Sequence, residues 1–115
     1  MPPDKRDAAY LWDMQESILT IQRFCRGKSH QDYLTDDLFR SAVDRQLEIL
    51  GEASHRVSED FREQHPEIPW RGIKAQRNVI AHEYGMINDD QIWDRCQHDL
   101  PPLLESLRAA LNSIK

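Results

Sequence analysis

Apolar residues recur every three or four positions along most of this chain, and this spacing restricts the fold more than any other feature. Over residues 4–26 the repeat consists of Leu11, Met14, Ile18, Ile21 and Cys25. Such a spacing places the apolar side chains on one face of a helix. The alternation of Val, Ile and Thr that is typical of strands is nearly absent. The sequence therefore predicts an all-α protein.

Breaks in the apolar repeat predict where the first two helices begin and end. Gly27 is expected to end the first helix, and residues 28–36 are expected to form a polar loop. Thr35 or Asp36 can serve as the N-cap of a second helix, which is expected to run to about residue 64. Three cations lie near the end of the first helix, Arg23, Arg26 and Lys28. They are interpreted as complementing the negative end of its dipole.

The second half of the chain predicts two or three more helices, four or five in all. A third is expected over residues 69–84, with Gly85 as its C-cap. Asn88 or Asp89 can cap a fourth. The prolines at 101–102 interrupt its apolar repeat, which predicts either two helices or one kinked helix.

Length, charge and cysteine usage narrow the class of protein. A chain of 115 residues has the size of one domain, expected over residues 1–115. It has no apolar run long enough for a membrane span or a signal peptide, so a cytoplasmic protein is expected. Cys25 and Cys96 form no CxxC pair or Cys/His cluster, so neither a disulfide, a metal nor a cofactor is expected. The net charge of −5 argues against nucleic-acid binding by the whole surface.

One stretch reverses this charge. Residues 70–82 contain Arg71, Lys74 and Arg77 and no acidic residue, in a chain with 20 acidic and 15 basic side chains. Cations bind phosphate by displacing counterions, so we expect a local RNA-binding surface that includes Arg71 and Lys74.

The same stretch holds the groups needed to cleave a phosphodiester. Arg77, Asn78 and His82 supply a permanent cation, an amide and a side chain that exchanges protons near neutral pH. The histidine could accept the proton of a ribose 2′-hydroxyl or protonate the leaving 5′-oxygen, while the arginine stabilises the phosphate charge. This reaction requires RNA, because DNA has no 2′-hydroxyl. The spacing alone is equally that of a salt-bridging arginine and a helix-terminal histidine.

Helical geometry bears on how Arg77 and His82 could meet. In a regular helix they lie about 140° apart around the axis. One copy brings them together only if the helix frays near Gly85 or if the arginine wraps around it. Two copies facing each other across a dyad could place both pairs in one cleft, so a homodimeric site is the more economical hypothesis.

The run from Arg77 to Tyr84, RNVIAHEY, resembles the RX4HXY motif of the HepT-like toxins, a branch of the HEPN superfamily of helical ribonucleases. Four further blocks, at residues 46–53, 68–70, 92–93 and 99–101, resemble the same family in the same order. Together they span most of the chain from Leu38 to Leu104.

This resemblance implies an up-and-down helical bundle that dimerises, and a toxin of a type VII-like toxin–antitoxin system. It implies that Arg77 and His82 are the catalytic pair of a metal-independent endoribonuclease acting on tRNA or mRNA, with Asn78 beside them. It also implies a MntA-like nucleotidyltransferase antitoxin that transfers AMP to Tyr84. AMP would block an RNA phosphate by its volume and its charge. The alternative is a non-catalytic helical dimer that serves as a binding partner or acceptor for such a nucleotidyltransferase.

Overall fold

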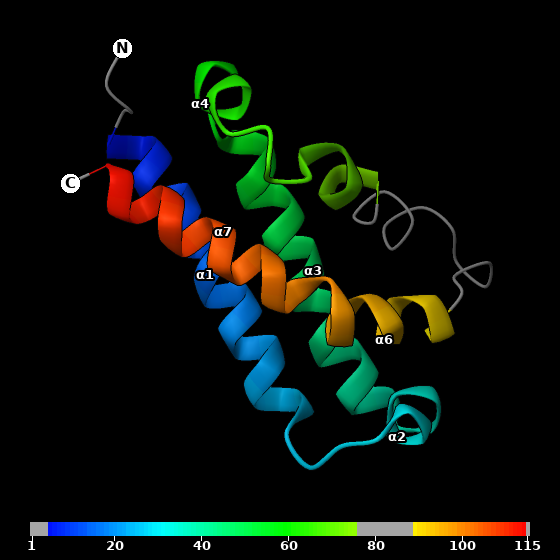
Figure 1. The fold of residues 1–115 in the computed structure, drawn as a ribbon. Coiled ribbons are helices and arrows are strands. Elements are labelled where there is room, and N and C mark those ends of the chain that lie inside the picture. Colours follow the sequence, from blue (N-terminus) through cyan, green and yellow to red (C-terminus); the bar gives the residue numbers. More distant parts are fainter. Residues whose placement is uncertain (1–4, 76–88, 115) are drawn as a thin grey trace.

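The computed structural model describes residues 5–75 and 89–114, and within these ranges it contains helices and no strand. The helices are α1 (Lys5–Cys25), α2 (His30–Thr35), α3 (Asp37–Arg56), α4 (Glu59–Gln64), α6 (Asp89–His98) and α7 (Leu100–Ser113). Residues 70–75 are also helical. α1 packs along α3 and also against α7, while α2 packs against α3 and α6 (Figure 1). The predicted all-α fold is confirmed.

The core consists of the apolar stripes that the sequence predicts. Leu11, Met14 and Ile18 of α1 are completely buried, and so are Val43 of α3 and Leu107 of α7. Burying a side chain of this size contributes about 1.5–3 kcal/mol to folding. The contacts of α1 with α3 and α7 therefore hold these three helices together. Among the described residues, no helix is both long and apolar enough to cross a membrane.

α1 ends where the sequence predicts. Gly27 has a φ angle of 72°, the left-handed conformation that favours glycine after a helix. The backbone N–H of Arg26 donates to the carbonyl of Arg23 at 3.4 Å, and that of Lys28 donates to the carbonyl of Cys25 at 3.0 Å. The main chain itself thus closes the last turn of α1.

The predicted polar loop over residues 28–36 is wrong, because most of it forms α2. Ser29 caps this helix: its Oγ accepts from the Asp32 N–H at 3.1 Å, and its N–H donates to Asp32 Oδ2 at 2.9 Å. Tyr33 is fully buried and packs α2 onto its neighbours. A helix of six residues has too few apolar positions to show a repeat, so periodicity alone misses it. Asp36, one of the two predicted caps, is the N-cap of α3 and accepts from the Phe39 N–H at 3.1 Å.

The predicted second helix is also interrupted, since α3 ends at Arg56 and α4 begins at Glu59. Ser58 is the N-cap of α4, and its Oγ accepts from the Phe61 N–H at 3.2 Å. The buried carboxylate of Asp7 accepts from the Ser58 N–H at 2.8 Å and from the Ser58 Oγ–H at 2.7 Å. A contact with the start of α1 therefore fixes the break.

At the prolines the chain forms two helices, not one kinked helix. α6 ends at His98 and α7 begins at Leu100, so both prolines lie in the first turn of α7. There the missing N–H would have no helical partner, and proline is tolerated. Asp89 is the first residue of α6, and Asn88 lies outside the described residues.

Candidate active site

The residues that the sequence assigns to catalysis and modification lie outside the described residues. These residues are Arg77, Asn78, His82 and Tyr84, and they belong to the range 76–88. The predicted end of the third helix at Gly85 lies in the same range. Two described parts flank this range, residues 65–75 and the first turn of α6.

The turn before residue 70 is held by side-chain contacts. The rings of Phe61 and His65 stack with centroids 4.3 Å apart, and His65 Nδ1 lies 2.9 Å from Glu67 Oε1. The hydrogen bond from His65 lowers the pKa of Glu67. Trp70 Nε1 donates to the carbonyl of His65 at 3.0 Å. These contacts fix the direction in which the helical residues 70–75 begin.

Arg71 and Lys74 project into solvent from this helical stretch. The stretch begins with a hydrogen bond from the Ile73 N–H to the Pro69 carbonyl at 3.1 Å, and the Ile73 side chain is buried in the core. Arg71 and Lys74 are exposed, and three positions apart they lie on the same side of the helix. Neither forms an ion pair with a carboxylate of the described residues. Both cations are thus accessible to a phosphate.

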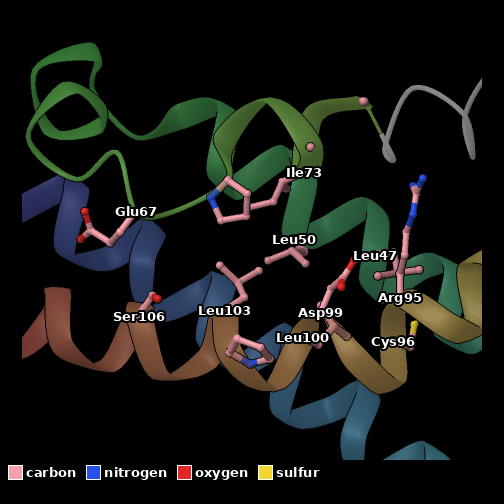
Figure 2. Close-up of a pocket in the computed structure, with 14 residues that line it drawn as sticks. Leu47, Leu50, Glu67, Ile73, Arg95, Cys96, Asp99, Leu100, Leu103 and Ser106 are labelled. Carbon is pink, nitrogen blue, oxygen red and sulfur yellow. The ribbon is translucent and has the colours of Figure 1, made fainter.

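A groove of about 590 Å³ lies between this stretch, α3 and the α6–α7 corner (Figure 2). Its apolar lining includes the side chains of Leu50, Ile73 and Leu103, which come from three different helical segments (Figure 2). Arg95 of α6 and Asp99 add a cation and a carboxylate to the lining. The groove therefore combines an apolar surface with charged groups.

The groups in the described lining that can exchange a proton are the carboxylates of Glu67 and Asp99 and one thiol. The described lining contains no histidine, and its one cysteine, Cys96, is buried. Burial raises the pKa of Cys96 to about 12, so the thiol stays protonated at neutral pH and is a poor nucleophile. Within the described ranges, no three His, Cys, Asp or Glu side chains are grouped so that they could hold a metal ion.

Contacts from α2 and α3 anchor the first turn of α6, directly after residue 88. His30 Nε2 lies 2.7 Å from Asp90 Oδ1, and the His30 ring stacks on Trp93 with centroids 6.0 Å apart. Arg40 Nε lies 4.0 Å from Asp89 Oδ2. The apolar repeat gives no sign of these contacts, because it predicts a loop at His30. The signal that could have found them is the Ser29–Asp32 capping box, which makes His30 the first residue of a helix.

A partly buried hydrogen bond supports the same corner of the fold. The Tyr33 hydroxyl donates to Asp44 Oδ1 at 2.5 Å. The Tyr33 ring packs against Trp93 of α6, with the ring centroids 5.8 Å apart. Burial raises the pKa of both Tyr33 and Asp44. Tyr33 is fully buried and is used by this contact, so the pair supports the fold and is not available to a substrate.

Comparisons with known proteins identify the family. Residues 14–110 match the family model described as "Ribonuclease HepT-like". The chain is 39% identical over 94 residues to "Probable ribonuclease HepT" of Thermococcus cleftensis, covering 82% of this chain and 86% of that protein. It is 35% identical over 100 residues to "Putative RNase MJ1380" of Methanocaldococcus jannaschii, covering 86% and 92% respectively.

The comparison with solved structures finds no match. The family match and both relatives nevertheless extend over most of the helical fold described above. The chain therefore belongs to the HepT-like ribonucleases of the HEPN superfamily.

Proposed function

We propose that this protein is the toxin of a type VII-like toxin–antitoxin system, an endoribonuclease that cleaves tRNA or mRNA. The observation that carries the proposal is the family match, because its range, residues 14–110, contains the whole run from Arg77 to Tyr84. The described lining of the groove contains the carboxylates of Glu67 and Asp99 and no histidine. The proton transfers near neutral pH are therefore assigned to the histidine of the motif.

The proposed chemistry uses the 2′-hydroxyl of the RNA as the nucleophile. His82 takes the 2′-proton, the 2′-oxygen bonds to phosphorus, and the bond to the 5′-oxygen breaks. The leaving oxygen gains a proton, from His82 of the second copy or from water, which leaves a cyclic phosphate and a 5′-hydroxyl. Arg77 stabilises the negative charge on the phosphate oxygens, and Asn78 orients them with its amide. This reaction requires no metal ion.

Substrate binding is proposed to involve Arg71 and Lys74. Both are exposed, and both lie on the helical stretch that runs toward the motif. The catalytic pair itself is proposed to form in a homodimer, because Arg77 and His82 lie about 140° apart in a regular helix. A cleft between two copies would combine the cations of both.

The partner is proposed to be a MntA-like nucleotidyltransferase that adds AMP to Tyr84. Tyr84 lies two residues after His82. A phosphodiester there adds negative charge and bulk next to the group that must meet an RNA phosphate. Modification would therefore inhibit cleavage by competing for the same space and by like-charge repulsion.

The central experiment measures cleavage of total RNA by purified, unmodified protein, with sequencing of the cleaved ends. Arg77→Ala and His82→Ala are each expected to reduce the rate by about 100-fold or more, the range for lost acid–base or charge stabilisation. The matched controls are Arg108→Ala and His98→Ala, two exposed side chains on α7 and α6. Cleavage that survives both motif substitutions would contradict the catalytic assignment.

Two further measurements test the assembly and the partner. Mixed Arg77→Ala and His82→Ala protomers should regain activity if the two copies share a cleft, and a monomeric active species would refute this. The intact mass of protein co-expressed with the nucleotidyltransferase should rise by AMP units, and Tyr84→Phe should abolish the increase. No growth arrest and no cleavage by the unmodified protein would instead favour the binding-module alternative.

A further inference from the structure

A second stretch of the chain, besides residues 70–82, is free of acidic residues. No Asp or Glu occurs over residues 17–31, which contain Arg23, Arg26 and Lys28. In a chain with 20 acidic and 15 basic side chains this is a local reversal of charge. We call these three cations, at the end of α1 and in the turn that follows it, the α1–α2 turn surface.

The hydrogen bonds that close the last turn of α1 come from the main chain and not from the side chains of these cations. The backbone N–H groups of Arg26 and Lys28 already bond to the carbonyls of the last turn, and Gly27 supplies the left-handed residue that this turn requires. Arg26 and Lys28 also follow the last helical residue, Cys25. Their side chains are therefore available for another role.

All three side chains are exposed, and none is paired with a carboxylate of the described residues. The next acidic residues along the chain, Asp32 and Asp36, are bonded to the backbone N–H groups that they cap. Lys28 Nζ lies 5.6 Å from the centroid of the Phe39 ring. A cation over an aromatic face keeps its N–H groups free for an outer anion while its position is restricted.

The arrangement favours a phosphate backbone as the ligand. Arg23 lies in the last turn of α1 and Arg26 in the turn that follows it, so the two guanidinium groups belong to the same end of one helix. Successive phosphates of one strand can therefore meet successive guanidinium groups, whose planar fork fits phosphate oxygens. The turn also leads directly into α2, which packs against α6, and α6 begins one residue after the range that contains the motif.

We propose that the α1–α2 turn surface is a second RNA-binding site, which holds the phosphate backbone of the substrate away from the bond that is cleaved. This inference rests on the proposed function, because it takes RNA as the substrate. It explains how a chain with a net charge of −5 can retain a polyanion: the cations that contact it are concentrated in two acid-free stretches.

The test measures binding of a fluorescent single-stranded 2′-O-methyl RNA, which cannot be cleaved through its 2′-oxygen, by anisotropy over a series of salt concentrations. The variant is Arg23→Gln, Arg26→Gln and Lys28→Gln combined. If each cation contacts one phosphate, the negative slope of log K against log salt should become less steep by about 2. The affinity at ~0.1 M salt should fall by about 100-fold.

The control variant combines Arg45→Gln, Arg56→Gln and Arg108→Gln, which remove the same charge from three exposed ion pairs. It should retain most of the affinity and the slope. An equal loss in both variants would show a net-charge effect and overturn the proposal. The proposal would also be overturned if polyglutamate displaced the fluorescent RNA as strongly as unlabelled RNA does, since this would indicate a site for acidic proteins.

This experiment is independent of catalysis. A wild-type protein that binds the RNA through this surface but cuts no RNA would refute the proposed function and leave the binding site standing. Conversely, a protein that cuts RNA but binds it equally well with and without the three cations would refute only the binding site.

Discussion

The hydrogen bond between Tyr33 and Asp44 should make a measurable contribution to stability that depends on pH. Tyr33→Phe removes the hydroxyl that donates to Asp44 at 2.5 Å and leaves the ring in its place against Trp93. Hydrogen bonds to charged groups contribute about 1.5–3 kcal/mol, and losing one leaves the acceptor unsatisfied. With the packing retained, we expect the free energy of unfolding to fall by about 2 kcal/mol at pH 7.

The sign of the pH dependence follows from the environment of Asp44. Burial raises its pKa in the fold, while the hydrogen bond from Tyr33 opposes that rise. The stability that accompanies a raised carboxyl pKa is fully present below the unfolded value and is lost as pH rises through the folded value. The hydrogen bond from Tyr33 stabilises the ionised form of Asp44, so its loss costs most where that form predominates. The difference between wild type and Tyr33→Phe should be largest at pH 7 and should shrink toward pH 4.

The assay is urea unfolding followed by circular dichroism, at one protein concentration because an oligomer's stability depends on it. Tyr10→Phe is the matched control, since Tyr10 forms no hydrogen bond with a described residue through its hydroxyl. In an Asp44→Asn background the cost of Tyr33→Phe should fall to about 1 kcal/mol, as for a neutral hydrogen bond. Equal costs for Tyr33→Phe and Tyr10→Phe, or a cost that does not change with pH, would refute the reasoning.

Three further outcomes are expected. Gly27→Ala should destabilise the protein by about 1 kcal/mol, because its φ of 72° is strained for any side chain, and a melting temperature unchanged from wild type would contradict this. Asp7→Ala should cost about 2–3 kcal/mol through the loss of two hydrogen bonds to Ser58, as measured by chemical unfolding, whereas Asp13→Ala on the exposed side of α1 should cost little. In a Cys25→Ser variant, Cys96 should react with a thiol reagent at pH 8 only after urea is added, because burial raises its pKa to about 12; rapid native labelling would contradict its burial.

Long helices with a regular apolar stripe could be predicted from the sequence. Leu11, Met14, Ile18 and Ile21 of α1 share one face, and all four are buried, so local periodicity and global packing agree. The end of α1 could be predicted for a similar reason. Gly27 is a local signal, and its left-handed φ does not depend on the rest of the fold.

The features that sequence analysis misses depend on contacts between distant residues. The break between α3 and α4 leaves Val57 and Phe61 in step with the apolar repeat. Asp7, 51 residues before Ser58, accepts the hydrogen bond of the backbone N–H at the break. The packing of α2 depends on the buried Tyr33, whose hydrogen-bond partner Asp44 lies on the next helix, α3. Of the candidate site, the exposure of Arg71 and Lys74 agrees with their predicted role, while the assignments of Arg77, Asn78, His82 and Tyr84 remain predictions.

The position of α7 has a consequence for biosynthesis. α7 follows the other described helices along the chain, yet it packs against α1, the first of them. While a ribosome is still making α7, the face of α1 that α7 covers remains in water, and the core is incomplete. A domain folds as a unit during synthesis. The emerging chain should therefore acquire its native fold, and with it any power to cut RNA, only after α7 has left the ribosome.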